Sequence, residues 1–221
     1  GSGAVSRVMC DMVGDTGRVF ALDRSAERAA VADHLALEAS IGNLHVVTGD
    51  VYDSPLRRGS FDLVWAEFLV EYLDDPQRAV VAMSSLVAPG GKLVVGELDG
   101  HGLFHYPLPD DVAAGLNVLS AALQGAFDPF AGRKVYHWLY QAGLKDIRVH
   151  MLPYHFYPGT APHDAVAQWR TKFTILAPRV AVRFGGQLAY EKWIERFLAM
   201  LADPAVFTYS VLFLVEGTVA V

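Results

Sequence analysis

The chain has 221 residues, a net charge of −6, 52% hydrophobic and 19% charged residues, and a single cysteine, Cys10. This length and composition predict one large folded domain without an intrachain disulfide. Lysine and arginine are scattered, and no apolar run is long enough to cross a bilayer. The composition therefore argues against nucleic-acid binding and a membrane partner, and favours a soluble, cytoplasmic protein.

Two glycines, Gly1 and Gly3, open the chain ahead of a helix predicted over residues 4–13. A leading Gly-Ser is typical of a cloning remnant. It is equally typical of a glycine-rich loop that binds a nucleotide at the start of a helix. Ser6 stands where the third glycine of the dinucleotide fingerprint would be, so this loop alone is a weak signal.

The next two predicted strands each end in an acidic residue. The strand over residues 18–22 runs into Asp23, at the spacing where a carboxylate reaches ribose hydroxyls. Its alternative role is a helix N-cap beside Ser25. The strand over residues 45–48 is followed by Asp50, which is placed to accept a hydrogen bond from an exocyclic amine such as that of adenine. Its alternative role is to form the turn.

Residues 61–98 form the unit around which the chain is organised. We expect a strand over residues 61–66 and a helix with Asp75 as N-cap and Pro76 at its first position. Pro-Gly-Gly at residues 89–91 ends the helix, and a second strand follows over residues 92–98. Two apolar runs joined by a helix indicate a parallel crossover, whose ligands bind beyond the carboxyl ends of the strands.

The second half of the chain alternates helices, strands and aromatic segments. Residues 99–109 are expected to form a loop over the pocket. The further predicted elements are helices over residues 110–126, 132–142, 163–176 and 187–202, and strands over residues 146–152 and 207–219.

These motifs in this order resemble the class I S-adenosylmethionine-dependent methyltransferases. The matching features are the glycine loop, the acidic residue after one strand, Gly-Asp after the next, FDLVW, and Pro-Gly-Gly before the following strand. The resemblance implies an α/β fold. Its doubly wound, mostly parallel, seven-stranded Rossmann-like sheet has an antiparallel last strand. It also implies a single methyltransferase domain over residues 1–221, with residues 153–206 as a helical, aromatic cap insertion. The family's first strand has no counterpart here, so we expect the working protein to have a further N-terminal segment.

The resemblance also implies S-adenosylmethionine as cofactor, with S-adenosylhomocysteine as its product, and a role for each motif residue. Gly1 and Gly3 approach the methionine moiety, Asp23 binds the ribose, Arg24 flanks the adenine, and Asp50 and Val51 hold it. Ala66, Glu67 and Phe68 border the methionine end of the cofactor.

Methyl transfer is a displacement that needs positioning, exclusion of water and, for a hydroxyl or acidic carbon acceptor, a base. His101, His105 and His155 are the candidate bases, each with the alternative of a hydrogen-bonded loop histidine. The candidate substrate-binding residues are Glu71, Tyr72, Phe104, Tyr106 and Tyr154. No pattern of metal ligands is present.

The sequence therefore favours methyl transfer to a small, hydrophobic or aromatic acceptor. It is compatible with a homodimer. One alternative is a methyltransferase-like module that binds the cofactor, or nothing, without methylating. A nicotinamide-dependent dehydrogenase is disfavoured by the missing third glycine and by the Pro-Gly-Gly turn.

Overall fold

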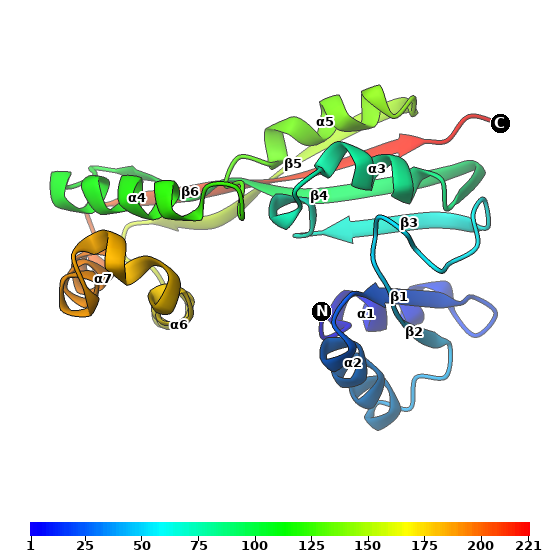
Figure 1. The fold of residues 1–221 in the computed structure, drawn as a ribbon, viewed down its shortest axis with the longest axis horizontal. Coiled ribbons are helices and arrows are strands. Elements are labelled where there is room, and N and C mark those ends of the chain that lie inside the picture. The colour runs from blue at the N-terminus through cyan, green and yellow to red at the C-terminus, as the bar shows by residue number, and fades with distance from the viewer.

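The computed structural model describes residues 1–221 as an α/β protein (Figure 1). In chain order its elements are α1 (Ala4–Val13), β1 (Val19–Asp23), α2 (Ala26–Glu38), β2 (Leu44–Thr48), β3 (Phe61–Glu67), η1 (Val70–Tyr72), α3 (Pro76–Ser84), β4 (Val87–Tyr106), α4 (Asp110–Leu123), α5 (Gly132–Gln141), β5 (Lys145–Pro158), α6 (His163–Val180), η2 (Ala181–Phe184), α7 (Gln187–Ala202) and β6 (Phe207–Thr218). The alternation of helices and strands over the first half confirms the predicted α/β class.

Local sequence signals account for the starts of the first three helices. Gly3 precedes α1 with a φ of 70°, and a side chain there would meet the Cβ of Ala32 at 3.0 Å. The Ser25 hydroxyl caps α2 by accepting a hydrogen bond from a backbone N–H of its first turn. Asp75 caps α3 in the same way, with Pro76 at the first helical position. The Asp75 cap and Pro76 are therefore where the sequence predicts them, whereas α2 is capped by Ser25 and not by Asp23, and α1 has no side-chain cap.

The chain has six strands in two sheets, so the seven-stranded sheet that the resemblance implies is not continuous here, and the family's first strand has no counterpart, as expected. β1 and β2 pair in parallel, and the other four strands follow the order β3-β4-β6-β5. β3 is parallel to β4, whereas β6, the last strand, is antiparallel to both of its neighbours as predicted. Between the sheets the rings of Phe20 and Phe61 meet edge to face at 5.6 Å, and no strand of one sheet pairs with a strand of the other.

β4 and β5 are much longer than the sequence predicts. β4 begins at Val87, ahead of the Pro-Gly-Gly turn, and continues through the segment expected to be a loop over the pocket. His105 and Tyr106 at its far end pair with β6, and β5 pairs with β6 as far as Pro158. The long strand β6 supplies backbone hydrogen-bond partners for the extra residues of both β4 and β5. The sequence pattern within β4 or β5 alone does not reveal such a distant partner. The helical part of the expected insertion begins only at His163.

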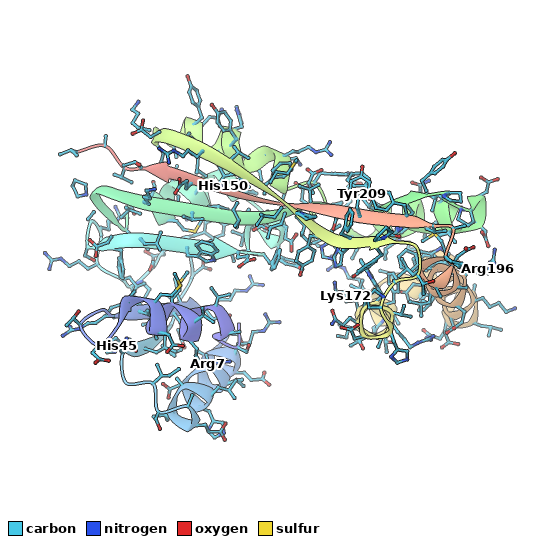
Figure 2. The ribbon with its side chains drawn as sticks, turned by 180° about the vertical axis from the view of Figure 1, so that it is seen from behind. Arg7, His45, His150, Lys172, Arg196 and Tyr209 are labelled. Atoms are coloured by element: carbon cyan, nitrogen blue, oxygen red, sulfur yellow. The ribbon has the colours of Figure 1, made fainter.

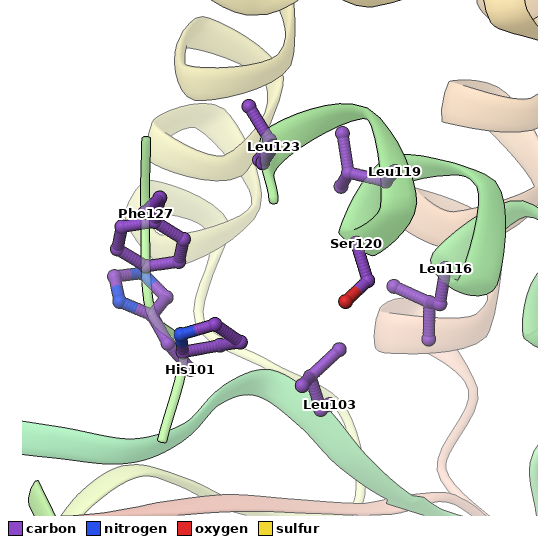
Figure 3. Close-up of a pocket in the computed structure, with 8 residues that line it drawn as sticks. His101, Leu103, Leu116, Leu119, Ser120, Leu123 and Phe127 are labelled. Carbon is purple, nitrogen blue, oxygen red and sulfur yellow. The ribbon is translucent and has the colours of Figure 1, made fainter. Parts of the chain in front are cut away.

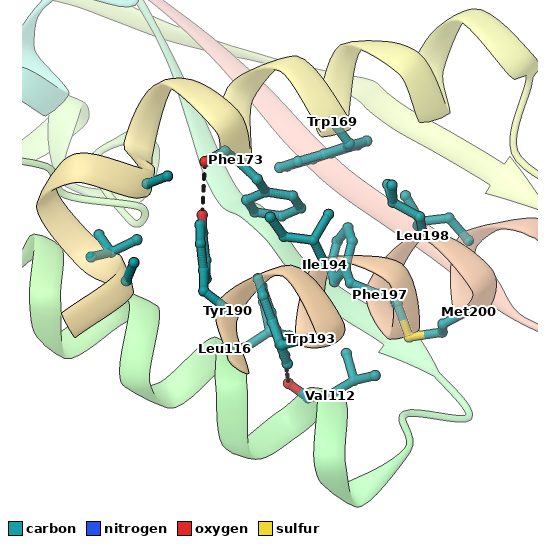
Figure 4. Packing of buried hydrophobic residues seen from close by; sticks show 14 of the residues in the cluster. Val112, Leu116, Trp169, Phe173, Tyr190, Trp193, Ile194, Phe197, Leu198 and Met200 are labelled. Carbon is teal, nitrogen blue, oxygen red and sulfur yellow. Dashed lines mark hydrogen bonds between the residues drawn. The ribbon is translucent and has the colours of Figure 1, made fainter. Parts of the chain in front are cut away.

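Two large apolar cores lie at opposite ends of the long sheet. One packs α3 and α5 against β3, β4 and β6. The other, which we call the cap core, packs α4, α6 and α7 together (Figure 4). In the cap core the Tyr190 hydroxyl donates to the carbonyl of Phe173 at 3.0 Å, and the Trp193 indole donates to the carbonyl of Val112 at 3.3 Å. Both buried polar groups are thereby satisfied. The cap therefore includes α4, which precedes the expected insertion.

Candidate active site

The first group of predicted site residues lies at the carboxyl end of β1. Asp23 is the last residue of this strand. One of its carboxylate oxygens accepts a hydrogen bond from the backbone N–H of Ser25 at 2.8 Å, and the other lies beside the backbone nitrogen of Gly1. The structure therefore brings the carboxylate and the glycine loop together. Arg24 is exposed beside them.

The residues after β2 form a tight turn. Asp50 is exposed, and its carboxylate accepts a hydrogen bond from the backbone N–H of Tyr52 at 2.9 Å, which is the turn-forming role of the alternative interpretation. Val51 is half-buried and packs against the core beneath β3. Gly49 is required here because a side chain would meet Pro55 at 2.7 Å.

The end of β3 leads directly into the centre of the molecule. Ala66 is buried and Glu67 is half-buried, and the next residue, Phe68, adopts a left-handed backbone angle with φ of 53°. Such a conformation is uncommon for a bulky residue and is found mostly at tight turns and functional sites. The turn directs the Phe68 ring to the edge of Tyr154 on β5, with centroids 5.9 Å apart.

Glu97, in the middle of β4, holds that turn in place. Its side chain is fully buried, and one carboxylate oxygen accepts hydrogen bonds from the backbone N–H groups of Leu69 and Val70 at 2.7 and 2.6 Å. These contacts tie β4 to the start of η1 and so set the position of Glu71. The second oxygen of Glu97 is buried without a hydrogen-bond partner.

Glu71 and Glu97 form a buried acidic pair. Glu71 is only 2% exposed, and one of its carboxylate oxygens also lacks a partner. Burial raises the pKa of Glu71 to about 7, and burial together with the charge of Glu71 raises the pKa of Glu97 to about 8. Burial, followed by the charge of Glu71, also raises the pKa of Tyr72. Near neutral pH this pair therefore retains protons that exposed carboxyl groups would release.

Replacing Glu97 with glutamine should flatten the pH dependence of stability. The folded state raises the pKa of Glu97 from an ordinary value of 4.5 to about 8, so it binds more protons than the unfolded state between these values. The free energy of unfolding therefore falls as the pH rises from 4.5 to about 8, by on the order of 1–3 kcal/mol for this group. Glutamine keeps the acceptor oxygen and cannot ionise.

Urea unfolding of both proteins at about pH 5 and about pH 8 measures this difference. The exposed Glu191, on α7, provides a matched control when it is replaced by glutamine. If wild type and Glu97→Gln lost the same stability between about pH 5 and about pH 8, the raised pKa assigned to Glu97 would be contradicted.

His101 and His155, two of the three predicted histidines, lie close together because the strands that carry them, β4 and β5, are irregular at these positions. His101 lies in β4, where the register with β6 shifts between Asp99 and Phe104. His155 lies in β5, at a similar shift, and has a left-handed φ of 44°. Irregularities of this kind re-aim side chains. The two imidazole rings lie 5.4 Å apart between centroids.

The hydrogen bonds of His155 define its tautomer. The Ser210 hydroxyl donates its only hydrogen to the carbonyl of Tyr154 at 3.2 Å, so it accepts from Nδ1 of His155 at 2.8 Å. Nδ1 therefore carries the ring hydrogen, and Nε2 presents its lone pair. Burial, then the positive charge of Lys172, lowers the pKa of His155 to about 4, so the imidazole is neutral near pH 7.

His105 is placed differently. Its Nδ1 is bonded to the hydroxyl of Thr208 at 2.8 Å and its Nε2 to the carbonyl of Gly102 at 3.0 Å. Its ring also meets Phe197 of the cap core edge to face. Both ring nitrogens are thus engaged within the protein, which matches the alternative of a hydrogen-bonded histidine.

A lysine from the cap completes the cluster. Lys172 projects from α6 toward the sheet, where its Nζ lies 3.5 Å from Nε2 of His101 (Figure 2). It also lies 4.5 Å from the centre of the Trp169 ring. Trp169 packs against both His101 and His155 and lies so close to Gly102 that a side chain at this glycine would meet the indole at 2.4 Å. Aromatic rings therefore enclose the polar groups.

A small, mostly apolar cavity begins at His101 (Figure 3). It lies between β4 and α4, and Ser120 is the polar residue on its far wall. The other lining residues are Leu103, Leu116, Leu119, Leu123, Phe127 and Pro129. Phe104 lines a neighbouring hollow that shares Leu103 and Leu116. Tyr106, also predicted to bind substrate, is 79% exposed at the end of β4 and lies outside both cavities.

Sequence reasoning missed three residues of this cluster, namely Glu97, Lys172 and Ser210. Glu97 could have been found as a carboxyl near the end of a predicted strand. Lys172 lies on an ordinary amphipathic helix, and Ser210 lies in an apolar strand, so neither carries a local signal. Their positions follow from how the cap and β6 pack.

The structure contains no group of three or more histidine, cysteine, aspartate or glutamate side chains arranged to hold a metal ion. None of its helices combines the length and apolar character needed to span a bilayer.

The first part of the chain is similar to known methyltransferases. Residues 1–95 match the family model described as a methyltransferase domain, which confirms the resemblance over this part of the chain. The chain is 30% identical over 106 residues to demethylmenaquinone methyltransferase of Oceanobacillus iheyensis, an alignment covering 48% of this chain and 44% of that protein. It is 33% identical over 98 residues to the ubiquinone/menaquinone biosynthesis C-methyltransferase UbiE of Legionella pneumophila, covering 44% of this chain and 39% of that protein. The chain thus spans less than half the length of these relatives.

Solved structures extend the similarity of fold to the whole chain. The [4+2]-cyclase SpnF superimposes with a TM-score of 0.64 at 16% identity, covering 100% of this chain and 73% of the cyclase. Phosphoethanolamine N-methyltransferase 2 of Haemonchus contortus, solved with S-adenosyl-L-methionine, gives 0.60 at 15% identity, covering 100% of this chain and 47% of that protein. At these identities the likeness establishes a Rossmann-like methyltransferase fold.

Proposed function

We propose that this chain transfers a methyl group from S-adenosylmethionine to a small hydrophobic or aromatic acceptor. The observation that carries the proposal is the line of rings from Phe68, at the end of β3, through Tyr154 to His155. These rings extend from the strand ends that carry the methyltransferase motifs to the enclosed polar cluster of His101, His155 and Lys172. The match of residues 1–95 to a methyltransferase domain supports the same conclusion.

In this proposal the cofactor lies across the carboxyl ends of β1, β2 and β3. Asp23 accepts hydrogen bonds from the ribose, and the left-handed Gly3 leaves room for the methionine moiety. Asp50 and Val51 border the adenine, and Phe68 borders the sulfonium, whose positive charge favours an aromatic face. A neighbouring fold solved with S-adenosyl-L-methionine supports this cofactor.

The protein's own groups then act on the acceptor. His155 accepts the acceptor's proton at Nε2, while Ser210 keeps the opposite nitrogen protonated. S-adenosylmethionine, when bound, would supply the methyl group that replaces this proton, and S-adenosylhomocysteine would be the product. α4, α6 and α7 cover the reacting groups and exclude water.

Replacing Asp23 with alanine should weaken binding of S-adenosylhomocysteine by about tenfold or more, because charge-assisted hydrogen bonds to the ribose are lost. Calorimetric titration of the 221-residue chain measures this affinity. Asp33→Ala is the matched control, since Asp33 is an exposed aspartate on α2. Equal affinities in folded Asp23→Ala and wild type would reject the ribose assignment, and no binding by wild type would reject the cofactor.

A non-methylating function is the second candidate. The fold superimposes on a protein named as a [4+2]-cyclase, so the fold alone does not specify methyl transfer. Consumption of S-adenosylmethionine in the presence of hydroxylated aromatic compounds separates the two functions. A chain that binds the cofactor yet never consumes it would favour the second.

A further inference from the structure

Lys172 is a half-buried cation that forms no ion pair in the enclosed cluster. Its close contacts are Nε2 of His101 at 3.5 Å and the Trp169 ring at 4.5 Å. Glu71 is near enough for its charge to oppose the lowering of the Lys172 pKa by burial, yet the two form no ion pair within 4.0 Å. Partial loss of hydration disfavours an unpaired cation, so the position of Lys172 favours a ligand with negative charge.

His101 holds the ammonium group of Lys172 in position. That group has only hydrogens to offer, so Nε2 of His101 accepts from it and Nδ1 carries the ring hydrogen. Nδ1 is buried without a hydrogen-bond partner and faces away from Lys172. The remaining hydrogens of the ammonium group are therefore the ones that can meet an oxygen with negative charge.

The surroundings define the rest of that ligand. The small, mostly apolar cavity under α4 begins at His101 and adjoins a larger apolar hollow lined by Phe104, with which it shares Leu103 and Leu116. On the other side of His101, the ring of His155 lies 5.4 Å away and presents the free lone pair of its Nε2. Tyr154 and Phe68 continue from there toward the proposed cofactor.

We propose that the acceptor is an aromatic or enolic compound with an acidic hydroxyl, and that Lys172, positioned by His101, binds this hydroxyl as its anion. The apolar body of the acceptor lies along the adjoining hollows between β4 and α4. His155 takes the proton that the hydroxyl releases. This inference rests on the proposed function, which it narrows to acceptors that ionise, and it makes Lys172 a residue that determines specificity.

The test uses 4-nitrophenol as a probe, because its anion absorbs at a longer wavelength than the neutral phenol. Wild-type protein with S-adenosylhomocysteine should bind the probe as the anion and lower its apparent pKa. Lys172→Met should weaken binding by about tenfold or more and remove the spectral change, since the charge-assisted hydrogen bond is lost. Lys172→Arg keeps the charge and should retain most of the spectral change.

Two controls isolate the charge of Lys172. Lys192→Met removes an exposed lysine on α7 and should leave probe binding unchanged. The uncharged 4-nitrotoluene should bind equally to wild type and to Lys172→Met, which also shows that the variant keeps a folded cavity. Circular dichroism of each variant reports its folding directly.

Equal affinity of wild type and folded Lys172→Met for the 4-nitrophenol anion would overturn the inference, and so would absence of probe binding to wild type. The affinity for S-adenosylhomocysteine is measured in parallel. Failure of wild type to bind this nucleoside rejects the proposed function. Normal nucleoside binding together with an unaltered probe affinity in Lys172→Met rejects only the role of Lys172.

Discussion

Replacing His155 with alanine should lower the rate of methyl transfer by about 10²–10⁴-fold, the usual contribution of a positioned general base. Nδ1 of His155 is bonded to Ser210, which leaves its Nε2 free to accept a proton. Its low pKa, about 4, reflects burial and then the charge of Lys172. An anionic acceptor on Lys172 would offset that charge and make the imidazole a stronger base. The readout is formation of S-adenosylhomocysteine with an acceptor that the wild-type chain methylates.

Two further variants separate the base from its surroundings. His150→Ala removes an exposed histidine of the same strand and should leave the rate unchanged. Ser210→Ala should lower kcat less than His155→Ala does, and should change the pH profile, because the ring is no longer held in one tautomer. A His155→Ala enzyme within a factor of two or three of wild type would exclude His155 as the base.

Replacing Phe197 with alanine should reduce the free energy of unfolding by about 3–5 kcal/mol. Phe197 is fully buried in the cap core, where its ring packs against Trp169, Phe173 and Trp193 at centroid distances of 5.0–5.6 Å. The cavity left behind cannot collapse, because three helices meet around it. Denaturant unfolding monitored by tryptophan fluorescence measures the loss, since two of these neighbours are tryptophans.

Val182→Ala serves as the comparison, because Val182 is 76% exposed in η2 and should change stability by less than about 0.5 kcal/mol. Binding of S-adenosylhomocysteine at a temperature where Phe197→Ala stays folded should be close to wild type, since the proposed cofactor residues lie at the other end of the sheet. A destabilisation below about 1 kcal/mol would mean that the cap core is less tightly packed than the structure indicates.

Helix starts were predictable from the sequence because their signals are local. Ser25 and Asp75 cap the helices that follow them, and Gly3 takes the left-handed angle that its position requires. The strand ends that lead to Asp23 and Asp50 were located to within a residue or two for the same reason. Side chains that satisfy a nearby backbone group act over a few residues, and a single sequence contains that information.

The extent of the strands was not predictable in this way. The segment after Asp99 contains two glycines and two histidines and has the composition of a loop, yet it pairs with β6, more than 100 residues away in the sequence. The local sequence pattern contains no information about a pairing partner so distant in the chain. The same pairing produces the irregularities that turn His101 and His155 toward each other.

The sequence by itself determined the α/β class, the helix caps, the acidic strand ends and the histidines that could act as bases, because each depends on residue type and short spacing. Only the tertiary structure decided which histidines meet, and that Glu97, Lys172 and Ser210 join them. It brings these residues together from β4, α6 and β6 into one enclosed cluster. Burial and neighbouring charge then alter their pKa values, and neither is a property of any one segment of the chain.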